Sequence, residues 1–220
     1  MRTLLSALLL LSAASVSADD HVRHEFSSTA PAGQVRRVVL DIPAGEVRIR
    51  NGAAGQIAIS GHVSREPDGA RSREREQRIV DDSSVEIVVR GQEAVVRRQF
   101  GPNAQSWRAG KFNSYRIDVE LPPGMSVDVL TRYGDLLVEG SFGDLDIDMT
   151  AGEVAVRVPK SSVRELRASC RAGEVRTNLG DEVITREGLF PGTTRFVNPA
   201  GKSLVNVHVT FGEVTVDLTP

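Results

Sequence analysis

Three residues near the N-terminus have the types and spacing of a copper or nickel site. If the chain is cleaved after Ala18, it begins Asp19-Asp20-His21. The free amine, two backbone amides and a third-position imidazole then supply square-planar nitrogen ligands, which suit Cu(II) or Ni(II). The alternative, which is the more common case, is a flexible N-terminus with a chance histidine. Asp19, Asp20 and His21 are therefore the candidate metal site, and we expect no other cofactor.

Outward carboxylates are the second candidate for chemistry. Asp146 and Asp148 alternate with apolar residues, and Asp135 and Asp144 lie nearby in sequence. Glycosidases need carboxyl pairs at a defined separation. Alternating outward aspartates more often keep a strand soluble, and the sequence has no Gly-x-Ser-x-Gly, phosphate loop, HExxH or CxxC motif. We therefore expect a non-enzymatic protein, with a carbohydrate-active lyase or hydrolase as the alternative.

Aromatic residues are scarce, and three of them cluster. Trp107, Phe112 and Tyr115 lie in or beside an irregular stretch rich in glycine, proline and asparagine. Aromatic side chains often anchor binding partners. The sequence offers these three as candidate binding residues, with a local cap core as the alternative.

The first eighteen residues have the organisation of a secretory signal peptide. Arg2 is followed by the apolar run Leu4–Leu11 and by the small-residue cleavage site Val16-Ser17-Ala18. The apolar run is shorter than the roughly 20 residues that a membrane-spanning helix needs. We therefore expect export to the periplasm or the extracellular space, with no transmembrane segment in the mature chain. A net charge of −2 without a basic block gives no case for nucleic acid.

One twelve-position pattern recurs along the chain: three apolar residues in alternation, a glycine–acid corner, and a second apolar alternation. It occurs at 38–49, 127–138, 145–156, 166–177 and 205–216, with a half-copy at 57–63 and a degenerate copy expected near 185–196. Starts that recur every 18 to 21 residues are typical of a stacked-repeat fold. The only cysteine, Cys170, occupies an inward position, so we expect a buried, unreactive thiol.

Alternation with a period of two places the apolar positions on one face of each strand, and the glycine lies where the chain turns. The structural turn glycines are Gly45, Gly134, Gly143, Gly152, Gly173 and Gly212. One copy cannot bury its apolar face alone, so the copies must stack. The regular period favours parallel stacking over an antiparallel roll. It would place Glu46, Asp135, Glu153, Glu174 and Glu213 along one edge, as a solvated row or, alternatively, a divalent-cation ladder.

These features predict an all-β, repeat-built β-solenoid with an irregular insertion at about 64–114. The domain organisation is a signal peptide at 1–18, a polar lead-in at 19–34 and a single domain at 35–220. Only four residues follow the last copy, too few to cover a strand edge. We therefore expect the C-terminal rung to be exposed and available for self-association.

The stretch 121–216 carries a Leu-Pro-Pro-Gly start at 121–124 and corners of the form Gly-acid-apolar at Gly134, Gly143, Gly152, Gly173 and Gly212. In these features it resembles the bacterial "putative adhesin" family of β-strand-repeat domains of unknown function. The resemblance implies a right-handed β-helix-like fold and an exported, adhesin-like scaffold or binding role in the cell envelope. It implies no catalytic residues, and it makes an envelope protein or a polysaccharide the expected partner.

Overall fold

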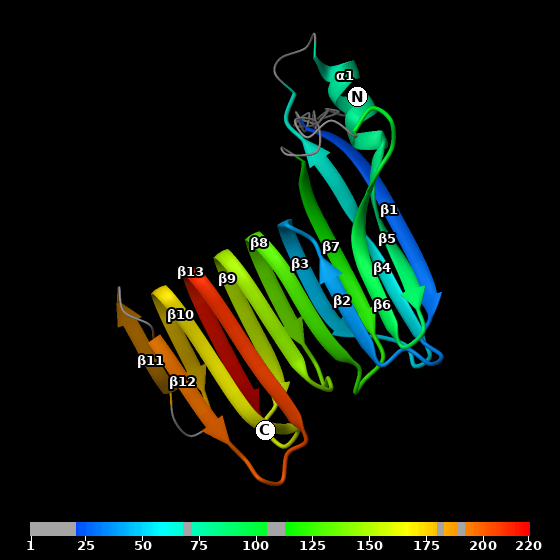
Figure 1. The fold of residues 1–220 in the computed structure, drawn as a ribbon. Coiled ribbons are helices and arrows are strands. Elements are labelled where there is room, and N and C mark those ends of the chain that lie inside the picture. The colour runs from blue at the N-terminus through cyan, green and yellow to red at the C-terminus, as the bar shows by residue number, and fades with distance from the viewer. Residues whose placement is uncertain (1–20, 68–71, 105–112, 180–182, 189–191) are drawn as a thin grey trace, which may run out of the picture.

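The computed structural model describes residues 21–67, 72–104, 113–179, 183–188 and 192–220, and this part of the chain is almost entirely β-structure. A single mixed sheet contains thirteen strands, and one short helix, α1 (Arg73–Asp81), lies at its N-terminal end (Figure 1). The strands are β1 Val22–Pro31, β2 Arg37–Asp41, β3 Ala44–Asn51, β4 Gln56–Arg65, β5 Ser83–Arg90, β6 Glu93–Phe100, β7 Ser114–Leu121, β8 Ser126–Glu139, β9 Leu145–Pro159, β10 Val163–Asn178, β11 Val183–Gly188, β12 Gly192–Val197 and β13 Ser203–Thr219. The all-β prediction is confirmed.

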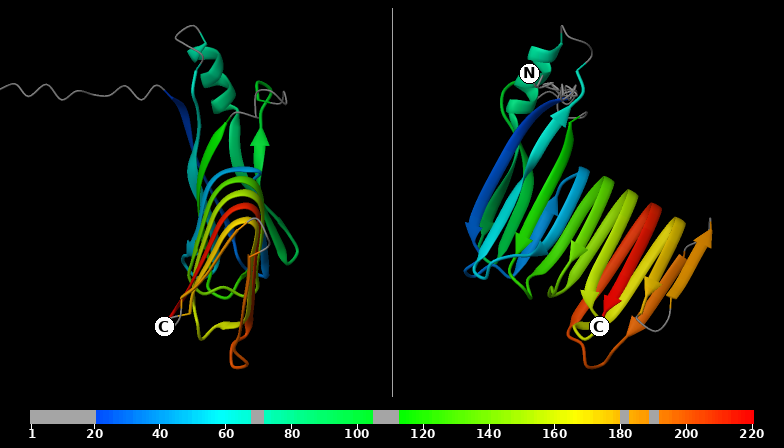
Figure 2. Two further views of the ribbon diagram at one scale, coloured as in Figure 1. Left: turned by 90° about the vertical axis from the view of Figure 1, so that its left-hand side faces the viewer. Right: turned by 180° about the vertical axis from the view of Figure 1, so that it is seen from behind.

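The sheet is folded into two walls. The long strands β8, β9, β13 and β10 each bend near their middle, and the bends line up as nested arches (Figure 2). The first wall runs β5-β6-β2 and then the first halves of the long strands, with β12 at its edge. The second wall runs β1-β4-β7-β3 and then the second halves, with β11 at its edge. Inward side chains of the two walls meet in one apolar core.

Parallel stacking with aligned glycines is confirmed. Gly45, Gly134, Gly152, Gly212 and Gly173 are successive partners across β3, β8, β9, β13 and β10. The acidic residues that follow them align in the same way, so the predicted edge of carboxylates also exists. The inward positions are buried as expected, including Cys170, which is 1% exposed and the free cysteine of the chain.

The strand order differs from that of a simple solenoid. The C-terminal strand β13 lies between β9 and β10 and pairs in parallel with both. The prediction of an exposed C-terminal rung is therefore wrong. Six apolar side chains of β13 are buried: Val205, Val207, Val209, Val214, Val216 and Leu218. A strand with this much apolar surface is stabilised more by two neighbours than by one, which explains its interior place.

The outer edge at this end belongs to β11 and β12 instead. Both pair antiparallel with β10, so the degenerate copy expected near 185–196 is not another parallel copy. Its sequence (ITREGLFPGTTRF, 184–196) lacks the apolar alternation of the other copies. Without that alternation it cannot fill an interior position, and it closes the stack as two short antiparallel strands.

The segment at 64–114, predicted as an irregular insertion, extends the sheet where the structure describes it. β5 and β6 form an antiparallel pair, and β6 continues the first wall beside β2. In the charged run before them, residues 73–81 form α1. Ile79 and Val80 of this helix are buried. The polar lead-in at 19–34 contains strand β1, whose backbone pairs with β4 along its whole length.

The corner glycines are required by their backbone and by their neighbours. Gly134 and Gly152 have φ angles of 130° and 139°, which side-chain-bearing residues rarely adopt. A Cβ on Gly152 would overlap the carbonyl oxygen of Gly134, and the same relation repeats along the stack. Gly143 differs from the predicted set, because it lies in the return before β9 and not at a corner. There a Cβ would come within 2.7 Å of Ser126 Oγ.

Candidate functional site

The most unusual surface of the protein is the outside of the corner, on both sides of the aligned glycines. We call it the corner strip. It consists of the residue before and the residue after each corner glycine on the four long strands: Tyr133 and Asp135, Ala151 and Glu153, Phe211 and Glu213, and Ala172 and Glu174. The register of the parallel strands makes it a continuous surface.

Two large aromatic side chains stand out of this strip. Tyr133 is 58% exposed and Phe211 is 56% exposed. The register places both beside Ala151, one on either side, so they occupy alternate strands. The other copies have alanine at this position: Ala44, Ala151 and Ala172. Exposed aromatic residues at equivalent positions are not needed for folding, because alanine serves the same corner elsewhere.

On the acidic side of the strip, Asp135, Glu153 and Glu213 are exposed and Glu174 is half-buried. Glu46, at the β3 end, is neutralised by Arg116, whose guanidinium lies 2.5 Å from its carboxylate. Within the described part of the chain, Asp135, Glu153, Glu213 and Glu174 take part in no ion pair. Adjacent strands lie about 4.8 Å apart, so these four carboxylates form a closely spaced row that can accept hydrogen bonds from a ligand.

A shallow hollow continues the strip at its β3 end. It has a volume of about 350 Å³ and is lined by Tyr133, Gly134, Ala44, Gly45, Glu46, Asn113 and Ser114. The Tyr133 ring therefore borders both the strip and the hollow. Ser114 is exposed at this end, whereas the Asn113 side chain is buried and donates a hydrogen bond to Ser83 Oγ at 2.9 Å.

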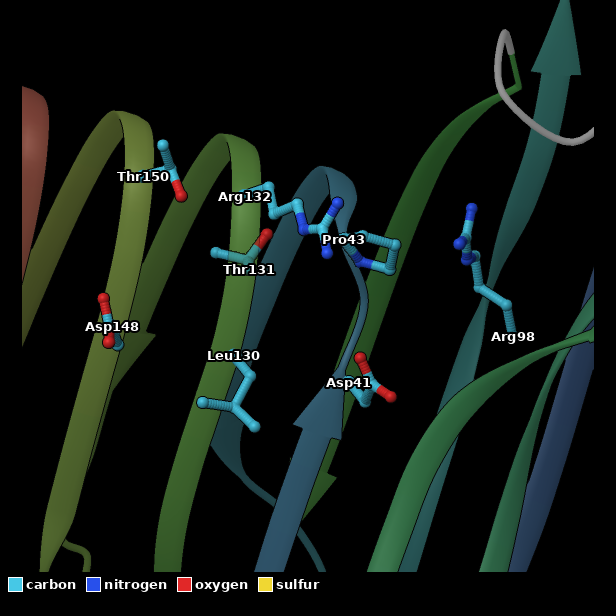
Figure 3. A pocket seen from close by; sticks show the side chains of 8 residues that line it. All are labelled: Asp41, Pro43, Arg98, Leu130, Thr131, Arg132, Asp148 and Thr150. Carbon is cyan, nitrogen blue, oxygen red and sulfur yellow. The ribbon is translucent and has the colours of Figure 1, made fainter. Parts of the chain in front are cut away.

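The outer face of the first wall carries a second hollow, of about 450 Å³ (Figure 3). Pro43, Arg132 and Thr150 lie at the bends, Asp41, Leu130 and Asp148 lie on the strands below them, and Arg98 comes from β6. The Arg98 guanidinium also lies 5.1 Å from the centroid of the Phe100 ring and 5.9 Å from that of the Tyr115 ring. The hollow is lined by both acidic and basic side chains and by the exposed Leu130, so it has no row of chemically similar groups.

The carboxylates predicted as a catalytic alternative lie on this wall. Asp146 and Asp148 are both exposed on β9. Asp144 accepts a hydrogen bond from the Leu204 amide at 2.9 Å and so connects the start of β9 to β13. Asp135 lies around the corner, on the other side of Gly134. The structure therefore does not bring the four aspartates together.

One cross-strand row on the first wall was not predicted. Asp148, His208 and Ser169 are register partners on β9, β13 and β10. His208 Nδ1 lies 3.0 Å from Ser169 Oγ. Among the described residues His208 makes no hydrogen bond with Asp148. Ser169 is paired on both sides by neighbouring strands, whose ladders use the backbone amides that could stabilise an oxyanion.

The predicted N-terminal metal site falls largely outside the described residues, because Asp19 and Asp20 precede them. His21 lines a hollow of about 290 Å³ that also contains His62, Arg23 and Arg116. Burial and the nearby Arg23 guanidinium lower the pKa of His62. Within the described ranges, no three His, Cys, Asp or Glu side chains are grouped as a metal site. The Cu/Ni site stays a prediction.

The predicted aromatic anchors have different outcomes. Trp107 and Phe112 lie outside the described residues. Tyr115 is only 1% exposed and belongs to the main core, which corrects the expectation that its ring is available to a partner. Tyr115 follows the alternation of β7 and points inward. Sequence reasoning missed Tyr133 and Phe211, although aligning the repeat copies shows them as aromatic residues among alanines.

A charge ladder crosses the outer face of the second wall. Arg157 on β9 donates to Glu139 on β8 at 2.7 Å and lies 3.6 Å from Asp217 on β13. The Glu139 carboxylate raises the pKa of Arg157. Arg50 and Glu120 form a further pair, at 2.6 Å, between β3 and β7. Alternating charges on adjacent strands favour this register and leave the second wall without an excess of either sign.

In the described part of the chain, no helix is both long and apolar enough to cross a bilayer. No family model matches the sequence, and no curated protein matches it. Solved structures with a similar chain path include a "putative cell adhesion protein" from Clostridium sporogenes (13% identity, TM-score 0.45, 90% of this chain and 100% of that one). They also include a "putative adhesin" from Parabacteroides distasonis (11% identity, TM-score 0.30, 62% and 57%) and another from Bacteroides fragilis (10% identity, TM-score 0.27, 88% and 97%). The solved structures to which this chain is similar are thus each described as a "putative adhesin" or a "putative cell adhesion protein" of bacteria.

Proposed function

We propose that the protein is a non-catalytic, exported, adhesin-like binding domain of the cell envelope. The two-walled stack is the scaffold, with the right-handed, β-helix-like winding that the family resemblance implies, and the corner strip is the contact surface. One observation carries this proposal: Tyr133 and Phe211 expose more than half of their surface at a position where the other copies have alanine. Aromatic residues that the fold does not need are typical anchors of binding surfaces.

The test is binding of the purified exported chain to intact cells and to envelope preparations. We expect wild-type protein to bind and the double variant Tyr133→Ala/Phe211→Ala to lose binding. Leu130→Ala is the matched control, because Leu130 is 52% exposed on the same strand but lies on the first wall. Equal binding by wild type and the double variant would contradict the proposal. Cell fractionation of the full chain tests export.

One observation favours a second candidate, a hydrolase, namely the 3.0 Å contact between His208 and Ser169 beside Asp148. We rank it lower because the three side chains lie on a flat, paired wall without free backbone amides to stabilise an oxyanion. Incubation with a serine-directed fluorophosphonate distinguishes the candidates. A label on Ser169 that is lost in His208→Gln would favour the hydrolase, and an unlabelled protein favours the binding domain.

A further inference from the structure

The two exposed rings of the corner strip have a spacing that selects among extended ligands. Tyr133 and Phe211 lie on alternate strands, with Ala151 between them. Two strand intervals place their Cα atoms about 10 Å apart along the stack. The alanine leaves space between the rings, so a ligand lying along the strip meets an aromatic surface, a gap and a second aromatic surface.

This spacing fits a glycan better than a peptide. In an extended β-1,4-linked glycan, one sugar is nearly as long as one strand interval, and every second sugar presents the same face. Alternate sugars can therefore stack on Tyr133 and Phe211. In an extended peptide, side chains on one face repeat every ~7 Å, which does not match two strand intervals.

The carboxylates define the chemistry of the ligand. Each carboxylate lies on the strand of one of these three residues: Asp135 with Tyr133, Glu153 with Ala151, and Glu213 with Phe211. Free carboxylates accept hydrogen bonds from hydroxyl and ammonium groups, and they repel anions. The hollow beside Tyr133 extends the strip toward the exposed Ser114, whose hydroxyl a further sugar can contact.

We propose that the corner strip binds an extended β-1,4-linked glycan with neutral or amino-bearing sugars, one sugar for each strand. The glycan lies along the stack, stacks on Tyr133 and Phe211, and donates hydrogen bonds to Asp135, Glu153 and Glu213. This inference rests on the proposed binding function and gives its ligand a chemical class.

Calorimetric titration of the exported chain tests it with defined probes. They are β-1,4-linked glucosamine oligomers of two to six sugars, the glucose hexamer, the mannuronate hexamer as an anionic control, and hexa-arginine as a cationic peptide. We expect the glucosamine hexamer to bind most tightly, the glucose hexamer less tightly and the mannuronate hexamer not at all. Binding should strengthen sharply from the dimer to the trimer, because three sugars are needed to reach both rings.

Variants separate the contribution of the aromatic rings to glycan binding from that of the carboxylates. Tyr133→Ala and Phe211→Ala should each weaken binding of the glucosamine hexamer by about tenfold, with no shift of the urea midpoint because both rings are exposed. Glu153→Gln should weaken binding of the glucosamine hexamer more than that of the glucose hexamer. Leu130→Ala should leave both affinities unchanged.

Three results would overturn the inference: no glycan binding, no step in affinity between dimer and trimer, or binding of hexa-arginine in place of the glycans. The last would make a basic protein segment the occupant. If the chain binds cells through Tyr133 and Phe211 but the oligosaccharides neither bind nor compete, the proposed function stands and the glycan is wrong. If the double variant binds cells as wild type does, both proposals fall.

Discussion

Replacing Gly152 by alanine tests the physical basis of the stack. Gly152 lies between Gly134 and Gly212, and its φ of 139° costs an alanine about 1–3 kcal/mol. The added Cβ would overlap the Gly134 carbonyl oxygen, so β8 and β9 must separate at the corner. If two backbone hydrogen bonds between β8 and β9 weaken, each adds about 1 kcal/mol to the loss of stability. We expect Gly152→Ala to lower the free energy of unfolding by about 3–5 kcal/mol.

Urea unfolding followed by circular dichroism measures this loss, and Gly91→Ala is the matched control. Gly91 also has a positive φ, of 61°, but a Cβ there meets nothing within 4 Å. Gly91→Ala should therefore lower the free energy of unfolding by only about 1 kcal/mol, which is the cost of a positive φ at an alanine. Equal losses in the two variants would refute the argument, because they would show that the close approach of neighbouring corners adds nothing to the need for glycine.

Three further predictions concern side chains away from the corner strip. Arg157→Met should lower the free energy of unfolding, measured in urea, by no more than about 0.5 kcal/mol at low salt and not at all at high salt, because its ion pairs are exposed. A larger loss that does not depend on salt would contradict this. Cys170 should react with a maleimide far more slowly in native protein than in urea, since the thiol is buried, and fast native labelling would refute that. His62 has a lowered pKa in the folded state, so the unfolded chain binds the proton more readily and stability should fall as the pH drops below about 6.5. His62→Gln should reduce this fall, and an unchanged pH profile would exclude His62 as its source.

The repeat copies allowed much of the fold to be predicted. Strand positions, inward faces and the alignment of the corner glycines follow from local alternation and from the conformational freedom of glycine at 134, 152 and 212. The burial of Cys170 follows in the same way. The segment at 64–114 and the strand β1 were underestimated, because their polar outward residues and weaker alternation hide the backbone pairing that holds them in the sheet.

The candidate site was predictable only in part. The row of carboxylates follows directly from the register of identical corners. Tyr115 was predicted to be available to a partner because it is aromatic, but its place in the alternation of β7 points it into the core. Tyr133 and Phe211 lie far apart in sequence, and their relation becomes visible only when β13 is known to lie two strands from β8.

The sequence by itself determined that the chain builds bent, one-face-apolar strands that must stack in parallel, because alternation and glycine are local properties. Only the tertiary structure decided the order of stacking. Every copy presents nearly the same apolar face, so local pattern cannot say which copy lies beside which. The long C-terminal copy gains most from two neighbours and enters between β9 and β10, while the poorly alternating segment closes the edge. That order brings the rings of Tyr133 and Phe211 to the two sides of one alanine, and so creates the surface on which the proposed function rests.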